Sequence, residues 1–159
     1  MPLKPTASCS IRRAVIDDAP QIAVMAREFN IYLQALGDKT SFQLDEGRIR
    51  RDGFGRDPAF EALIAERDEI PLGYLLHHQG YDSDRAERYV MVCDLFVREQ
   101  ARREGAGRLL MSAAMQHCRE IGGYGLMWWV FKPNTIAVAF YRQLGAKLID
   151  DLDFMYLDA

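Results

Sequence analysis

Hydrophobic and polar positions change period several times along the chain, which predicts a mixture of helices and strands. Apolar residues recur every three or four positions in four stretches, the spacing of a helix that buries one face. Acidic residues and a proline open the first stretch, and an asparagine can cap the last. The predicted helices cover residues 17–36, 44–52, 105–121 and 134–145.

Strand candidates are short stretches rich in apolar residues and bounded by glycine, proline or charged residues. They cover residues 10–15, 60–66, 72–79, 88–97, 126–131, 147–149 and 153–157. The stretch 88–97 is the most apolar, which indicates an interior position in the sheet. This order of elements predicts one α/β domain over residues 10–159 with a mixed sheet, preceded by a loose tail over 1–9.

Composition narrows the class of protein. The chain has 159 residues and a formal net charge of −3, so general affinity for nucleic acid is not expected. No apolar run is long enough to cross a membrane, and the first residues lack the apolar core of a signal peptide. Three widely spaced cysteines favour a reducing cytoplasm, and three histidines show no zinc-ligand spacing, so no metal is expected.

The segment from Val97 to Leu110 carries the strongest chemical signal. An apolar strand runs into a basic loop and then into a helix, with Arg102, Gly105 and Gly107 in the spacing R-x-x-G-x-G. Glycines let backbone N–H groups approach an anion, and a helix N-terminus adds unpaired donors and a positive dipole end. This arrangement predicts a pyrophosphate site. An ordinary helix start with solvated arginines is the alternative.

A second informative stretch follows a strand that contains Trp128 and Trp129, which are expected to face opposite sides. Asn134 is either a helix cap alone or a group that also hydrogen-bonds a ligand. Tyr141 is either an amphipathic residue at the edge of the core or a proton donor. A phenol suits the second role because its pKa near 10 keeps it protonated at pH 7.

Together these motifs resemble the GNAT superfamily of acetyl-CoA-dependent N-acetyltransferases. The resemblance rests on a strand ending in DLFV, the R-x-x-G-x-G loop and the later pattern N-x-x-A-x-x-F-Y-x-x-x-G-A. Upstream, the sequences DGFGRDP and LIAE look like diamine acetyltransferases of the spermidine/spermine and thialysine type, and Gly73, Tyr74 and the Tyr81–Asp82 pair continue that likeness. The order of elements agrees over nearly the whole chain.

The resemblance implies a single-domain α/β fold with a mixed, mostly antiparallel sheet, whose central strands splay apart around acetyl-CoA, and it suggests a homodimer. The residues that would hold the pyrophosphate are Arg102, Arg103, Gly105, Ala106, Gly107 and Arg108. The residues whose backbone would bind the pantetheine arm, in a strand that carries a bulge in family members, are Leu95, Phe96 and Val97. Asn134 and Tyr141 would also contact the cofactor.

The implied reaction is direct attack of a primary amine on the acetyl thioester in a ternary complex. Tyr141 would act as general acid toward the leaving thiolate, and a carboxylate or a water chain would take the proton of the amine. Polyamine-type relatives carry adjacent acids before the DLFV run, whereas this chain has Cys93 and then Asp94. Because neighbours in a strand face opposite sides, Asp94 is not expected to replace a side chain at position 93.

Three explanations stay open for the base. Asp94 acts through water, a residue such as Glu28 or Tyr81 serves instead, or the acceptor amine has a lower pKa. The acids within 150–153 are candidates for an acceptor pocket. The expected acceptor is a diamine, a polyamine or a lysine-like amino acid. Acetylation of a protein N-terminus or lysine, and an acyl-CoA-binding module with little catalysis, are the alternatives.

Overall fold

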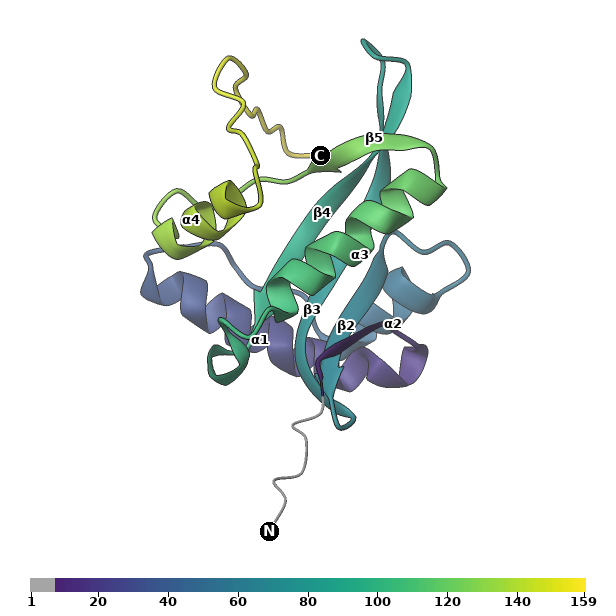
Figure 1. Cartoon of the computed structure of the whole chain (residues 1–159), viewed down its shortest axis with the longest axis vertical. Helices are drawn as coiled ribbons and strands as arrows, with labels where there is room; N and C mark the ends of the chain where they lie inside the picture. The colour runs from purple at the N-terminus through teal and green to yellow at the C-terminus, as the bar shows by residue number, and fades with distance from the viewer. Residues whose placement is uncertain (1–7) are drawn as a thin grey trace. The chain divides into compact units, whose positions relative to one another are not determined.

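The computed structural model describes residues 8–159, so most of the predicted tail over 1–9 lies outside the described residues. Figure 1 shows the order of the elements along this part of the chain. The strands are β1 (Ser10–Arg13), β2 (Glu61–Arg67), β3 (Ile70–Asp82), β4 (Glu87–Val97) and β5 (Gly123–Met127). The helices are α1 (Ala19–Ala35), α2 (Glu46–Phe54), α3 (Ala106–Glu120) and α4 (Thr135–Gln143), with short 3-10 turns η1 (Ile16–Asp18) and η2 (Glu99–Ala101).

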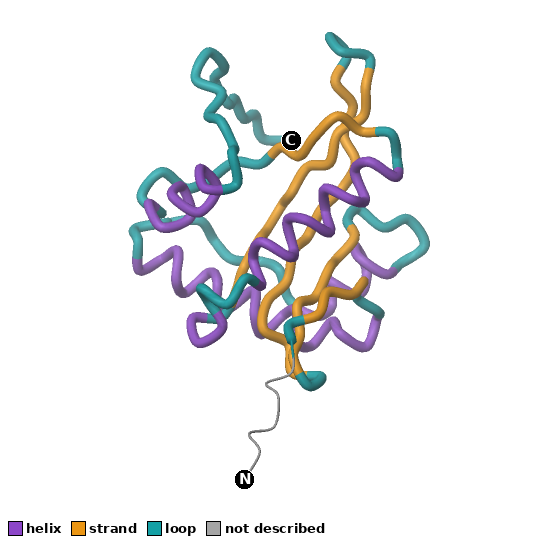
Figure 2. The backbone as a smooth tube through the Cα atoms, in the orientation of Figure 1, coloured by secondary structure: helices purple, strands orange, loops and turns teal. Residues whose placement is uncertain are grey.

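The strands form one sheet in the order β1-β2-β3-β4-β5 (Figure 2). Neighbouring strands are antiparallel except for the parallel pair β4 and β5. The predicted mixed, mostly antiparallel sheet is therefore confirmed, and β4 is an interior strand, as the apolar run 88–97 indicated. None of the helices in the described part of the chain is both long and apolar enough to span a membrane.

The two faces of the sheet are covered by different helices. Tyr74 and Leu76 of β3 belong to a buried cluster with Ile22 of α1 and Ile49 of α2. Side chains alternate along a strand, so His77 points to the other face, where its ring lies 4.9 Å from that of His117 on α3. Helices α1 and α2 thus pack on one face and α3 packs on the other, the near face in Figure 1.

Backbone contacts divide the chain into two compact units. The first ends at Trp129 and contains the sheet with α1, α2 and α3, and the second, Val130–Ala159, contains α4. The predicted site residues from Asp94 to Arg108 belong to the first unit. Asn134 and Tyr141 belong to the second.

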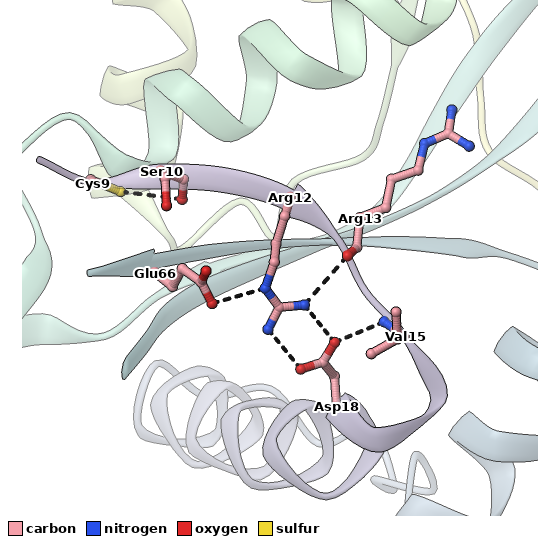
Figure 3. A network of polar contacts seen from close by, with 7 residues as sticks. All are labelled: Cys9, Ser10, Arg12, Arg13, Val15, Asp18 and Glu66. Atoms are coloured by element: carbon pink, nitrogen blue, oxygen red, sulfur yellow. Dashed lines mark hydrogen bonds and ion pairs between the residues drawn. The ribbon is translucent and has the colours of Figure 1, made fainter. Parts of the chain in front are cut away.

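Arg12 of β1 fixes the start of α1 to the sheet (Figure 3). Its guanidinium donates to both carboxylate oxygens of Asp18 at 2.7 and 2.8 Å, and its Nε donates to Glu66 of β2 at 2.9 Å. Asp18 also accepts the backbone N–H of Val15 at 2.8 Å. These contacts hold the pKa of Asp18 below its usual value, first through the Arg12 hydrogen bond. The network therefore anchors the helix that buries one face of β3 and β4.

The four predicted helices are confirmed, with ends displaced by a few residues, whereas β5 begins earlier than the predicted strand 126–131. Gly123 explains this displacement. A Cβ on Gly123 would lie 2.6 Å from Cys118 Sγ and 3.2 Å from the Arg88 carbonyl oxygen. Gly123 is therefore part of a strand that approaches α3 and β4 closely. Trp128 and Trp129 follow β5, so their predicted place in this strand is wrong, and the structure does not test the alternation of their side chains along it.

The predicted closing strands 147–149 and 153–157 are also wrong. Residues 146–159 have no regular secondary structure, and their apolar side chains, including Leu148, Phe154 and Leu157, are exposed. A strand forms only when a neighbouring strand satisfies its backbone groups. None of the described strands pairs with this segment, so its alternation of residues produces no sheet.

Candidate active site

A β-bulge in β4 places Cys93 and Asp94 on the same face of the sheet. The pairing with β3 shifts by one residue between Val92 and Asp94, so Cys93 is an extra residue without a β3 partner in the described sheet. Asp94 reaches Tyr74, and Cys93 packs against the buried cluster that contains Tyr74. A bulge interrupts the alternation of side chains. The expectation that Asp94 points away from the side chain at position 93 is therefore wrong.

Asp94 has the environment of a general base. It is half-buried, and its Oδ2 accepts a hydrogen bond from the Tyr74 hydroxyl at 3.0 Å. Burial raises the pKa of Asp94 to about 6, while the hydrogen bond from Tyr74 lowers it. Tyr74 is fully buried, and burial raises the pKa of its phenol well above the usual value, so it stays protonated as the donor. Asp94 is thus a carboxylate that changes charge close to neutral pH, as proton transfer at that pH requires.

Cys93 does not have the environment of a nucleophile. Burial raises the pKa of its thiol to about 11, with the charge of Asp94 acting in the same direction. The thiolate is the reactive form of cysteine, and a thiol with this pKa is almost entirely protonated at neutral pH. Cys93 therefore acts as a small packing residue. It contributes to the site through the bulge that it forms and not through the chemistry of its sulfur.

The strands β4 and β5 separate beyond Met91. Their pairing ends where Met91 lies opposite Met127, and residues 92–97 of β4 have no partner on β5 in the described sheet. The half of β4 that carries Asp94 therefore has an open edge on this side. This opening matches the splayed strands that the resemblance implied.

The backbone of β4 directs alternate residues toward this open edge. The Arg98 N–H donates to the Leu72 carbonyl at 2.9 Å, and hydrogen-bonded pairs alternate along antiparallel strands. Phe96 therefore directs its backbone groups toward β3, whereas Leu95 and Val97 direct theirs away from β3. Of the three predicted backbone contacts to the pantetheine arm, the geometry favours Leu95 and Val97.

The loop before α3 has the form of an anion site. Arg103 and Gly105 adopt positive φ angles of 64° and 90°, which turn the chain sharply into the helix. Gly105 is the N-cap residue and offers no side chain to the first helical N–H groups. The first N–H group that donates within the helix is that of Leu109, to the Gly105 carbonyl, so the N–H groups of Ala106, Gly107 and Arg108 before it face outward. They can bind an anion together with the positive end of the helix dipole.

The arginines of this loop differ in their contacts. Arg102 donates its Nε hydrogen to the Val97 carbonyl at 2.9 Å, and its guanidinium lies 4.9 Å from the centre of the Tyr32 ring. Arg102 therefore fixes the loop to the end of β4. Arg103 and Arg108 are exposed and project positive charge into solvent. The predicted site residues from Asp94 to Arg108 thus lie at the end of β4, in the loop that follows it and at the start of α3.

Asn134 and Tyr141 lie in the second unit, on α4. Asn134 is buried, and its side-chain oxygen accepts the Ala137 N–H at 3.2 Å, so it caps the helix as predicted. Tyr141 is half-buried, and its ring centre lies 5.3 Å from that of Phe140. The roles of Asn134 and Tyr141 toward a cofactor stay predictions.

The structure weakens the other candidates for the base. Glu28 of α1 accepts two hydrogen bonds from Arg98, at 2.9 and 3.0 Å, so an arginine already occupies both of its carboxylate oxygens. Tyr81 is 64% exposed near the far end of β3, where it pairs with Arg88. The acids within 150–153 are exposed in the segment that follows α4. Tyr74, by contrast, is a site residue whose role the sequence did not reveal, because contact with Asp94 depends on the register of two strands.

These features coincide with a family of known activity. The model of the acetyltransferase (GNAT) family matches residues 25–146, which include the bulge, the open edge and the loop before α3. The chain belongs to the GNAT acetyltransferase family. It is therefore an N-acetyltransferase by descent, and the family uses acetyl-CoA as its acetyl donor.

Individual relatives agree with this assignment. Thialysine N-epsilon-acetyltransferase of Sus scrofa is 30% identical over 149 residues, which cover 89% of this chain and 85% of the relative. L-ornithine N5-acetyltransferase of Arabidopsis thaliana is 31% identical over 97 residues, which cover 60% of this chain but only 42% of that enzyme. These two names confirm the predicted resemblance to the diamine and amino-acid branch of the family.

The fold is also found among solved structures. An aminoglycoside acetyltransferase from an uncultured soil metagenomic sample superposes with a TM-score of 0.75, covering 95% of this chain and 96% of that chain. The two sequences are 19% identical, so this likeness concerns the fold of the GNAT acetyltransferase and not its substrate.

Proposed function

We propose that this GNAT enzyme transfers the acetyl group of acetyl-CoA to a primary amine of a small molecule, namely a diamine, a polyamine or a lysine-like amino acid. The position of Asp94 carries the proposal. The bulge brings this carboxylate to the face where the polyamine-type pattern requires an acid, beside the open edge of β4. The relatives named for thialysine and ornithine support an amino-acid or diamine acceptor.

Asp94 is proposed to take the proton that the amine loses. An alkyl amine has a pKa of about 10.4, so it arrives as a cation and must lose a proton before its lone pair can attack. A carboxylate with a pKa of about 6 is charged at neutral pH, attracts the cation and accepts the proton directly or through water. Tyr74 supports this step because its hydroxyl donates to Asp94 and favours the charged carboxylate.

The described residues fit the phosphates and the pantetheine arm of acetyl-CoA. The N–H groups at the start of α3, together with Arg103 and Arg108, are proposed to bind the pyrophosphate. The backbone groups of Leu95 and Val97 are proposed to bind the pantetheine arm at the open edge of β4. When bound, acetyl-CoA supplies the thioester whose C–S bond breaks as the new amide bond forms.

Tyr141 is proposed to protonate the thiolate that leaves, because a phenol holds its proton at neutral pH and can donate it to a stronger base. Tyr141→Phe should then lower kcat by about 100-fold, the scale of a lost acid, with little change in acetyl-CoA affinity. Steady-state rates and calorimetric binding of acetyl-CoA check this split. An unchanged kcat would remove Tyr141 from the mechanism.

We further propose that both units form one acetyltransferase domain, which acts as a homodimer in the cytoplasm. The family model supports the first point because its match crosses the boundary at Trp129. Exposed apolar residues after α4 supply a surface that a second copy can bury. Free thiols at Cys9, Cys93 and Cys118 agree with a reducing compartment.

One experiment tests the function. Coenzyme A release is measured with acetyl-CoA and a panel of diamines, polyamines, ornithine, lysine and thialysine, beside a peptide with a free N-terminus. Release with one small amine class, and not with the peptide, is expected. Acetyl-CoA should also raise the melting temperature. A thermal shift without release from any amine would indicate a binding module, and release with the peptide alone would indicate a protein acceptor.

A further inference from the structure

A second group of chemistry-bearing side chains lies on the opposite face of the sheet from Asp94. Glu61 of β2 and His77 of β3 stand directly opposite each other in the strand register, and His117 of α3 covers them. One ring nitrogen of each histidine and one carboxylate oxygen lie within 4.8 Å of one another. Two histidines and one carboxylate are a donor set that borderline divalent metals bind.

Each of the two histidines has one buried ring nitrogen without a hydrogen bond to the described chain. His77 is 2% exposed, and its Nδ1 has no hydrogen-bond partner among the described residues. His117 Nε2 is also buried without a hydrogen bond in the described chain, since the nearest Glu61 oxygen is 3.8 Å away. Buried polar atoms without partners are costly.

Solvent and a metal ion can reach this group. A cavity of about 210 Å³ is bounded by both histidines, with Arg13 of β1, Leu63 of β2 and Gln116 of α3 along its walls. A volume of this size holds several water molecules. The cavity contains none of the residues assigned to acetyl transfer, so it is a separate feature of the molecule.

We propose that Glu61, His77 and His117 form a binding site for a divalent transition metal of the Zn²⁺ class. Three protein ligands with an adjoining cavity leave a fourth position for water, as in open zinc sites. Tetrahedral zinc with bonds of about 2.0 Å places its ligand atoms about 3.3 Å apart, so small side-chain rotations close the set.

The ring nitrogens of the site also favour metal binding. An imidazole binds a metal through a ring lone pair, and no hydrogen bond from the described chain occupies His77 Nδ1. Metal binding would supply the partner that each buried nitrogen lacks. The ion therefore replaces two unsatisfied groups with coordinate bonds, which stabilises the folded chain through linkage.

Arg13 opposes the metal. Its guanidinium lies 3.6 Å from Glu61 and 3.4 Å from His117 Nδ1, so it competes for the carboxylate and repels a cation. Arg13 is two-thirds exposed and can turn into solvent when the ion binds. Removing this charge should therefore strengthen metal binding. A variant without Arg13 is expected to bind the ion more tightly than the wild-type protein.

The test uses the full-length, untagged protein after dialysis against a chelator. Zn²⁺ affinity is measured by calorimetry, and Co²⁺ is added as a spectroscopic probe of the ligands. Wild-type protein should bind one ion and melt at a higher temperature with Zn²⁺. Glu61→Gln and His117→Gln should each weaken Zn²⁺ binding at least about 100-fold. The loss of a residue that only hydrogen-bonds to a metal ligand has a smaller effect. Arg13→Gln should strengthen it.

His78→Gln is the matched control. His78 neighbours His77 in β3, but it is exposed, and its replacement leaves all three proposed ligands in place. It should bind Zn²⁺ as the wild-type protein does. The proposal is overturned if wild-type protein shows no Zn²⁺ binding, if Glu61→Gln and His117→Gln bind like wild type, or if a thiolate-to-cobalt band shows that a cysteine holds the ion.

Discussion

The two faces of the sheet each bury a titratable group, and the two groups differ in their partners. On the face of α1 and α2, Asp94 accepts a hydrogen bond from Tyr74, and its pKa rises to about 6. On the face of α3, His77 has an Nδ1 without a hydrogen-bond partner in the described residues, and its pKa falls to about 4. Burial is the largest cause of both shifts, and in both cases it favours the neutral form.

The difference separates a group that can change charge during a reaction from one that stays neutral. Tyr74 stabilises the carboxylate, so Asp94 is charged at pH 7 despite its burial. Among the described residues, His77 Nδ1 has no hydrogen-bond partner, and burial keeps the imidazole uncharged over the physiological range. One face thus offers a base, and the other a neutral imidazole.

The largest expected effect is on the face of Asp94. Asp94→Asn keeps the size of the side chain and an acceptor for Tyr74, but it removes the base. The kcat/KM for the amine should fall by about 100-fold to 10,000-fold, the range of a lost proton-transfer group. Coenzyme A release at pH 7.5 measures the loss.

His78→Gln serves as the reference in the same assay, because this exposed side chain on β3 belongs to neither buried group. Acetyl-CoA affinity should be equal in both variants. An Asp94→Asn enzyme with wild-type kcat/KM would show that the two faces do not differ in catalysis, and the base would have to lie elsewhere.

The second prediction concerns the stability of the fold. The groups on the two faces should change the free energy of unfolding in opposite directions as pH rises. The raised pKa of Asp94, from 3.8 to about 6, gives stability that is complete below 3.8 and is lost as pH rises through 6. The lowered pKa of His77, from 6.5 to about 4, gives stability that is complete above 6.5 and is lost as pH falls through 4. Each full shift corresponds to about 3 kcal/mol.

Denaturant unfolding at several pH values between 4 and 7 measures these contributions. Relative to wild type, Asp94→Asn should lose stability as pH falls, because the His77 contribution is then unopposed. His77→Leu should gain stability over the same interval, because the Asp94 contribution remains. Parallel curves for wild type and both variants would mean that neither group is shifted.

The comparison also shows what the sequence could and could not reveal. The helices, the sheet class and the R-x-x-G-x-G loop follow from local patterns, since helical spacing and glycine chemistry act within a few residues. The bulge at Cys93 does not, because it is a property of the pairing between two strands. Strict alternation therefore gave the wrong face for Asp94.

The same reasoning explains the other failures. Glu61, His77 and His117 are separated by 16 and 40 residues and meet only through strand register and helix packing. No spacing rule for metal ligands covers such a set. The start of β5 at Gly123 was also not predicted, because the close approach of this residue to Cys118 is visible only in three dimensions.

The smallest effect tests the hydrogen bond that distinguishes Asp94 from His77. Tyr74→Phe removes the donor at 3.0 Å while the ring still fills its place beside Phe96. A hydrogen bond to a charged group contributes about 1.5–3 kcal/mol, so its loss should raise the pKa of Asp94 by about one to two units. The acid limb of the pH profile of kcat/KM should then move from about 6 to higher pH, with little change in its plateau.

The pH profile of this variant decides among three roles for Tyr74. If Tyr74 only fills space, Tyr74→Phe leaves the acid limb where it is, and the variant differs from wild type in stability alone. If Tyr74 were itself the base, the plateau would fall by orders of magnitude. An upward displacement of the limb at constant plateau is expected only when Tyr74 positions Asp94 and holds its charge. That result would make Asp94 resemble His77, whose Nδ1 is buried without a hydrogen bond to the described residues, and would trace the difference between the two faces to one hydroxyl.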